Sequence, residues 1–259
     1  MTALALPFTA PRTGFRRAAI GRSRGTTTRR GGRATESPRD PRWCGPVVTL
    51  TAMTGTPAAA LSTAVAAALG LPCYDDVFPA LVAAATGATL ADATDMDEVV
   101  PSRLAVAMAW SACHPGAPEL DGALAAVRVL ERFPEATRDV IHAVAADPAG
   151  GVIVGRHAAF VLAGHERAAH VLLDAPLRWR QAALQAEFGW SASDAHDHLR
   201  ARDRARRRAV VRAHGVEVTD AGPYDVVLDA SVADLPSMVA VVVAEAARQG
   251  AVAAYDRPR

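Results

Sequence analysis

Two arginines stand at the ends of predicted β-strands, in places where they could bind phosphate. Arg156 ends the apolar run 152–156, and Arg180 follows a second run at 170–176. The carboxyl ends of parallel strands meet at one edge of a sheet, where open α/β sheets bind their ligands. Guanidinium groups bind phosphate in a planar, two-pronged geometry. The sequence therefore predicts a phosphate-handling site at this edge.

The segment after the first predicted strand stands where a glycine-rich phosphate loop would lie. Such loops end in Lys-Ser/Thr and supply backbone N–H groups, a cation and a hydroxyl that holds Mg²⁺. Here the segment reads Thr54-Gly55-Thr56-Pro57-Ala58-Ala59-Ala60. All 28 positions that hold lysine or arginine hold arginine. Schiff-base chemistry, lysine general bases and a phosphate-loop lysine are therefore excluded.

Short apolar runs alternate with helical stretches from residue 47 onward, which is typical of βαβ units and a parallel sheet with helices on both faces. The predicted strands are 47–51, 71–74, 152–156, 170–176 and 224–231. Pro57 suits the first turn of the first helix, and Gly70 suits its end. Later helices are expected at 157–163, at 191–214 and from the last strand to about 249. The fold class is α/β.

Residues 76–148 interrupt this alternation and predict a helical insertion of three to five helices. The expected breaks are Pro101, His114-Pro115-Gly116 and Pro134. The five strands and their helices make one domain, 47–250, followed by a tail at 251–259.

Residues 1–46 differ in composition from the rest of the chain. They carry ten arginines against two acidic residues, whereas the remainder carries 18 against 25. They are rich in Arg, Ser, Thr, Gly and Pro without periodicity, which predicts disorder. A nucleic-acid arm or a transit peptide would have this composition, but we favour a passive tail or an extension from a misassigned start codon.

Several classes of site are disfavoured by the remaining residue types. The cysteines Cys44, Cys73 and Cys113 lie far apart, which argues against a zinc site or a disulfide framework and predicts a cytoplasmic protein. His196 and His198 would point to different faces of a helix, so no metal site is expected. No apolar run is long enough to cross a bilayer, so no membrane partner is expected.

Five motifs occur in the order and spacing of one known family. They are Leu-Gly-Leu-Pro-Cys-Tyr-Asp at 69–75, Val-Ile-Val-Gly-Arg at 152–156, a strand ending in Ala-Pro before an arginine at 171–180, Asp-x-x-Arg at 203–206 and Tyr-Asp-Val-Val-Leu-Asp-Ala-Ser at 224–231. In these motifs the chain resembles the cytidylate kinase-like family of P-loop nucleoside monophosphate kinases, over about 47–248.

The resemblance implies a three-layer P-loop fold with a parallel five-stranded sheet. The helical segment 76–148 would bind the acceptor nucleotide, and 180–214 would form a short lid. ATP and Mg²⁺ would serve an active member, and no tightly bound cofactor is expected. The implied catalytic arginines are Arg156 on the acceptor phosphate and Arg180 and Arg206 on the transferred one. The implied nucleotide or phosphate contacts are Gly55, Thr56, Asp75, Gly155 and Asp203.

Each of these residues also has an ordinary structural interpretation. Arg156 could form a surface salt bridge, Asp75 could cap a helix, and Asp203 could pair along its own helix. His157 could contact the nucleotide or cap the next helix. The arginine run surrounds its helix, which fits a lid first, a solvated helix second and a nucleic-acid contact last; it consists of Arg200, Arg202, Arg204, Arg206, Arg207, Arg208 and Arg212.

The phosphate loop departs from the family pattern, which keeps several glycines and a cation there. Pro57 fixes φ and removes an N–H donor, and alanines replace the cation and the Mg²⁺-binding hydroxyl. Thr56, Ser62 or Thr63 could supply a substitute hydroxyl. We therefore expect a nucleoside monophosphate kinase-like protein with weakened phosphoryl transfer to a nucleotide. The alternative is a non-catalytic nucleotide-binding or regulatory relative of the same fold, and nucleic-acid binding is the least favoured idea.

Overall fold

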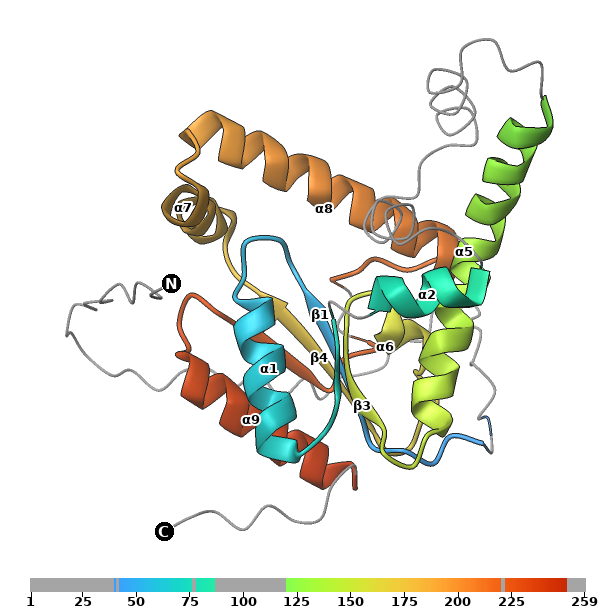
Figure 1. Ribbon diagram of the computed structural model, residues 1–259. Helices are drawn as coiled ribbons and strands as arrows, with labels where there is room; N and C mark the ends of the chain where they lie inside the picture. Colours follow the sequence, from blue (N-terminus) through green and yellow to red (C-terminus); the bar gives the residue numbers. More distant parts are fainter. Residues whose placement is uncertain (1–39, 41, 76–77, 87–119, 220–221, 251–259) are drawn as a thin grey trace, which may run out of the picture.

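The core of the protein is a five-stranded parallel β-sheet with strand order β2-β3-β1-β4-β5 (Figure 1). The computed structural model describes residues 40, 42–75, 78–86, 120–219 and 222–250; within 120–131 it describes the backbone alone. The strands are β1 (Val47–Ala52), β2 (Cys73–Tyr74), β3 (Gly151–Val154), β4 (Ala168–Asp174) and β5 (Val226–Asp229). The predicted α/β class and five-stranded parallel sheet are confirmed.

Strand β1 lies at the centre of the sheet, where it pairs in parallel with β3 on one side and β4 on the other. Its sequence VVTLTA is buried at five of six positions. A strand covered on both faces reads as a nearly continuous run of apolar and β-branched residues, which is why no alternation is seen here. The end of β1 is therefore the middle of the sheet's carboxyl edge.

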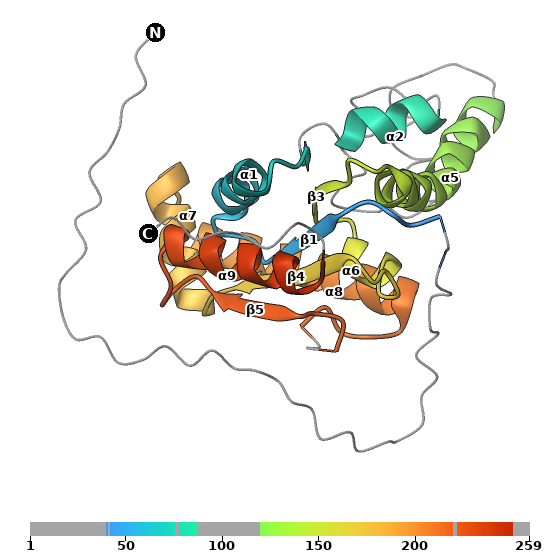
Figure 2. The ribbon, with the colours of Figure 1, turned by 90° about the horizontal axis from the view of Figure 1, so that it is seen from below.

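Helices cover both faces of the sheet and make three layers (Figures 1 and 2). The helices are α1 (Ala58–Leu69), α2 (Phe78–Thr86), α5 (Leu120–Ala146), α6 (Ala158–Val161), α7 (Leu177–Phe188), α8 (Ala192–His214) and α9 (Leu235–Arg248). Helices α1 and α9 share one apolar cluster with the sheet. On the other face, α2, α5 and α6 form a second cluster, and α6 with α8 a third. Gly70 ends α1 in a left-handed conformation, as predicted.

Helices α7 and α8 form an arm, the α7–α8 arm, that lies across the carboxyl edge (Figure 1). They pack on each other through their own small apolar cluster of Leu184, Ala195 and Leu199, against which Leu177 and Trp190 lie. Ser191 caps α8 by accepting a hydrogen bond from the backbone N–H of Asp194. The same serine ends the turn after α7, so a single strong cap fixes where the arm reverses direction.

Two predictions about individual elements are wrong. Pro134 does not break a helix, because it lies inside the continuous helix α5. Its neighbours Phe133 and Ala136 are buried in the second cluster, and this packing offsets the hydrogen bond that a mid-helix proline loses. The third strand ends at Val154, so Gly155 and Arg156 lie in the turn that follows it.

Other predictions fall outside the described residues. These are the segments 1–39 and 251–259 and the expected breaks at Pro101 and His114-Pro115-Gly116. Among the helices that the structure describes, none is long and apolar enough to cross a membrane.

Candidate functional site

The loop after β1 is a tight turn that uses its own polar groups. The backbone N–H and the hydroxyl of Thr56 both donate to the carbonyl oxygen of Met53, at 3.2 and 2.6 Å. Gly55, between them, has φ +83°, a left-handed conformation that glycine adopts without strain. The Thr56 hydroxyl, a predicted phosphate contact, is therefore engaged inside the turn.

Gly55 is also the point where the α7–α8 arm meets the loop. A Cβ atom at this position would lie 2.9 Å from the backbone oxygen of Arg180 and 3.1 Å from its Cβ. Real Cβ atoms essentially never approach another heavy atom so closely. The first turn of α7 thus packs directly on the loop, and only glycine fits between them.

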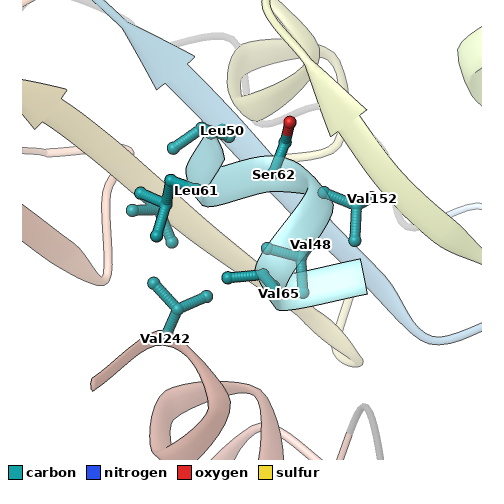
Figure 3. Close-up of a pocket in the computed structure, with 8 residues that line it drawn as sticks. Val48, Leu50, Leu61, Ser62, Val65, Val152 and Val242 are labelled. Carbon is teal, nitrogen blue, oxygen red and sulfur yellow. The ribbon is translucent and has the colours of Figure 1, made fainter. Parts of the chain in front are cut away.

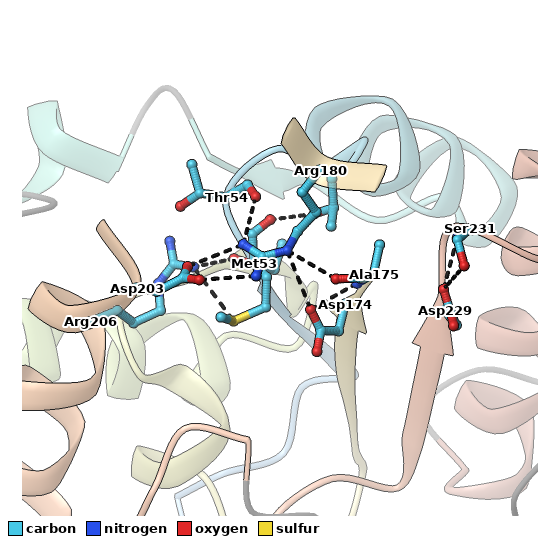
Figure 4. A network of polar contacts seen from close by, with 11 residues as sticks. Met53, Thr54, Asp174, Ala175, Arg180, Asp203, Arg206, Asp229 and Ser231 are labelled. Carbon is cyan, nitrogen blue, oxygen red and sulfur yellow. Dashed lines mark hydrogen bonds and ion pairs between the residues drawn. The ribbon is translucent and has the colours of Figure 1, made fainter. Parts of the chain in front are cut away.

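The side chain of Arg180 is buried and has polar partners in four residues, one of which is Asp174, whose carboxylate lies 3.8 Å from Nε (Figure 4). Its Nε donates to the carbonyl of Ala175 at 3.0 Å, and its Nη1 donates to the carbonyl of Thr54 at 3.1 Å. Its two terminal nitrogens also grip the carboxylate of Asp203 at 3.2 and 2.9 Å. Arg180 therefore ties together the ends of β1 and β4 and the middle of α8.

Arg206 lies one helical turn after Asp203 in α8, and its side chain also contacts the end of β1. Its Nη1 donates to the carbonyl of Ala52, the last residue of β1, at 2.6 Å, and lies 3.9 Å from the sulfur of Met53 (Figure 4). Burial lowers the pKa of this guanidinium, and the nearby charge of Asp203 opposes that shift. One buried and one half-buried cation therefore face the end of the central strand.

The loop turns carbonyl oxygens toward these two cations. Ala52 and Thr54 accept from Arg206 and Arg180, whereas a phosphate loop would direct backbone N–H groups into such a space. Pro57 stands at the helix N-cap, has no N–H and makes no side-chain cap bond. The N–H of Ala58 donates to the carbonyl of Thr56 at 2.8 Å. Two of the amide donors at the start of α1 are thus missing or engaged.

Two of the hydroxyl groups of the loop and α1 are already engaged within the protein. The Ser62 hydroxyl is buried and donates to the carbonyl of Ala59 at 3.1 Å, and that of Thr56 is engaged as described. Figure 3 shows that Ser62 lies beside Leu61 and Val65, packed over the sheet in an interior that leaves no room for a water molecule. Neither the Thr56 nor the Ser62 hydroxyl is therefore free to bind Mg²⁺ as the hydroxyl of a phosphate loop does.

Arg156 lies on the β2 side of the edge. It donates to the carbonyls of Val154 and Asp75 at 2.5 and 3.1 Å, and its Nη1 is 3.5 Å from the Asp75 carboxylate. Its guanidinium carbon sits 4.6 Å from the centre of the Phe78 ring, a cation–π distance. The structure thus joins Arg156 to Asp75, and separately joins Arg180, Asp203 and Arg206 to the loop of Gly55 and Thr56.

The turn after β3 has an unusual backbone. Gly155, Arg156 and His157 have φ of 73°, 52° and 58° in succession, and two of the three are not glycine. Such strained positions cluster at functional sites. The expectation that His157 caps α6 is wrong, since its side chain makes no cap bond and its ring lies 5.5 Å from that of His214. Burial lowers the pKa of His157 to about 4.

The arginine run of α8 divides into inward and outward residues. Arg206 points inward, and Arg207 pairs with Glu217 at 2.9 Å on the surface. Four other exposed members recur every four residues, so they share the outward side of the helix: Arg200, Arg204, Arg208 and Arg212. The run therefore has two distinct sides, which its spacing alone did not reveal.

Comparison with known proteins identifies the family and supports the fold. The family model described as the cytidylate kinase-like family matches residues 47–232. The chain belongs to the cytidylate kinase-like family. Its fold also resembles a crystal structure of an uncharacterized protein from Eubacterium ventriosum ATCC 27560, with a TM-score of 0.52 and 14% identity over 76% of this chain and 96% of that one. No curated protein matches the chain. The family membership gives a nucleotide kinase-like fold, and the solved neighbour supports the fold alone.

Proposed function

We propose that this chain is a nucleotide-binding member of the cytidylate kinase-like family in which phosphoryl transfer is strongly weakened. The observation that carries the proposal is the meeting of two guanidinium groups, Arg180, which is buried, and Arg206, which is half-buried, at the end of the central strand β1. Burying a cation is costly unless an anion or carbonyl compensates it. A protein that places two of them at a sheet's ligand-binding edge is built to receive negative charge there.

The proposed ligand is a nucleoside phosphate, with its phosphates between the loop and the α7–α8 arm. ATP is the expected phosphate-rich nucleotide, and the arm would serve as the lid. Arg156 would hold a second, acceptor phosphate on the β2 side, where Asp75 and Phe78 position its guanidinium. Gly155 supports this role because its φ of 73° lets the strand turn sharply into Arg156.

Weakened transfer follows from what the loop lacks. Transfer of a phosphoryl group depends on close positioning and on charge neutralisation by cations, Mg²⁺ included. Pro57 removes one amide, Ala58 and Ala59 carry neither cation nor hydroxyl, and the Thr56 hydroxyl is engaged with Met53. Arginines from the arm can bind the phosphates, but they do not restore the metal site.

Calorimetry with ATP–Mg²⁺ and separately with CMP, followed by a phosphoryl-transfer assay, tests the proposal. We expect measurable binding of ATP with transfer far slower than in a kinase with a complete phosphate loop. Arg206→Met should weaken ATP binding, and Arg204→Met, an exposed arginine half a turn away, should leave it unchanged. Phosphoryl transfer as fast as in such a kinase would contradict the proposal that transfer is weakened. Absence of nucleotide binding at millimolar concentration would contradict the whole proposal.

A further inference from the structure

Asp203 occupies the guanidinium group that a phosphate would need. Both of its carboxylate oxygens accept from Arg180, at 3.2 and 2.9 Å, in the two-pronged geometry that guanidinium also uses for phosphate. Arg180 has five N–H donors, and four of them are already used by Asp203, Ala175 and Thr54. A phosphate therefore cannot form a two-pronged contact with the terminal nitrogens of Arg180 while Asp203 remains in place.

The exposure of Arg180 and Asp203 would allow a ligand anion to replace the carboxylate of Asp203 beside Arg180. The Arg180 side chain is only 7% exposed, so it requires a compensating charge at all times, and the Asp203 side chain is 23% exposed and can turn toward water. Asp203 sits on α8, whereas the loop and β4 hold Arg180 from the other side. Exchange of the carboxylate for a ligand would therefore release α8 from Arg180 and leave Arg180 in place.

We propose that Asp203 is an internal competitor that makes this site selective for polyphosphate. A single carboxylate carries one negative charge, so an anion of similar charge gains little by displacing it. A pyrophosphate group, as in a nucleoside di- or triphosphate, carries more charge and spans both Arg180 and Arg206. This inference rests on the proposed function, because it describes how the same site chooses its ligand and how binding releases α8 from Arg180 of α7.

The test is a titration of inorganic phosphate, pyrophosphate and tripolyphosphate into the full chain and into Asp203→Asn. Asparagine keeps the shape and one acceptor but removes the charge. Asp197→Asn is the matched control, since Asp197 is exposed on the same helix. We expect Asp203→Asn to bind pyrophosphate about tenfold more tightly than wild type does. The ratio between its affinities for pyrophosphate and for phosphate should be smaller than in wild type. Asp197→Asn should bind as wild type does.

If Asp203 had only a structural role, Asp203→Asn would lower pyrophosphate affinity and would not raise it. In that case the variant would lose stability and lose pyrophosphate affinity together, and this result, or unchanged affinity in a folded variant, would overturn the proposal. The proposal instead expects lower thermal stability with higher affinity. Should Asp203→Asn not fold, hydrogen exchange of the wild-type chain decides the matter. Pyrophosphate should speed exchange around Asp203 in α8 and leave α9 unchanged, and slower exchange in α8 would overturn the proposal.

These results are separable from the proposed function. Tighter pyrophosphate binding by Asp203→Asn with no nucleotide binding would support the competitor and reject nucleotide as the ligand. Nucleotide binding by wild type, with no gain of pyrophosphate or nucleotide affinity in the variant, would support the proposed function and reject the competitor.

Discussion

Arg206 donates a hydrogen bond to the backbone carbonyl of Ala52 at 2.6 Å, although 154 positions separate the two residues in the chain. The bond joins the middle of α8 to the last residue of the central strand. Because the guanidinium is half-buried, the bond forms at the cost of partly removing a charge from water, and this desolvation lowers the pKa of Arg206. Under the proposed function, Arg206 serves the ligand more than the stability of the fold.

Arg206→Met is expected to separate binding from stability. Methionine fills a similar volume without the desolvation cost, so the free energy of unfolding should change by less than about 1 kcal/mol. ATP affinity should fall about tenfold, because one charge-assisted contact is lost. Urea unfolding and calorimetry on the same preparations check both values. A large loss of stability would show that Arg206 serves chiefly to hold α8 on the sheet.

Gly55→Ala is expected to destabilise the protein more than Gly70→Ala does. Both glycines have positive φ, but the added Cβ meets the Arg180 backbone at 2.9 Å at position 55 and nothing within 4 Å at position 70. Strain alone should cost about 1 kcal/mol at Gly70, and strain plus the clash about 3 kcal/mol at Gly55. Chemical denaturation measures the difference. Equal costs would mean that α7 can move off the loop freely.

Pro57→Gly is expected to raise affinity for pyrophosphate while lowering stability. Glycine restores a backbone N–H at the start of α1 and frees φ, but it increases the conformational entropy of the unfolded chain, at about 1 kcal/mol. Pro236→Gly, in the first turn of α9, is the matched control and should lower stability without changing affinity. Calorimetry and thermal unfolding of the two variants provide the comparison. Unchanged pyrophosphate affinity would show that the amide at 57 does not face the ligand.

His157 predicts a loss of stability in mild acid. Burial lowers its pKa to about 4 from 6.5, and the neighbouring His214 and Arg206 add to the shift. The unfolded chain therefore takes up a proton below about pH 6.5 that the folded chain resists. The contribution of neutral His157 to the free energy of unfolding is fully present above about pH 6.5. It is lost as the pH falls toward 4, by up to about 3 kcal/mol.

The variant His157→Asn isolates this contribution. Asparagine tolerates the left-handed backbone at this position and does not titrate. The difference in unfolding free energy between wild type and variant should shrink by up to about 3 kcal/mol from pH 7 to pH 4. Urea melts across this range provide the measurement. A difference that does not vary with pH would show that His157 is solvated in the native state.

Most of the fold follows from local sequence pattern. The apolar run of β1 and the glycine at position 70 mark a strand and a helix end because each depends on its own neighbours alone. Pro134 misled the prediction for a related reason. Its effect on α5 is decided by the packing of Phe133 against elements distant in sequence, which a local pattern does not contain.

The partners within the site were harder to predict than its residues. Strand order places the turn of Arg156 beside β2, and Asp75 follows β2 directly, so their meeting follows from topology. Arg180 and Asp203 meet only because α7 reverses into α8 at a particular length and angle. Residue spacing does not indicate that the Thr56 hydroxyl bonds within its own turn. It also does not indicate that the Arg206 side chain points toward the sheet.

The apolar contacts that Leu184, Ala195 and Leu199 make between α7 and α8 are separate from the clusters that bind helices to the sheet. The seam between the two helices is therefore small and independent of the packing on the sheet. A movement of the first half of α8 away from α7 would open this seam alone and would leave the core around the strands intact.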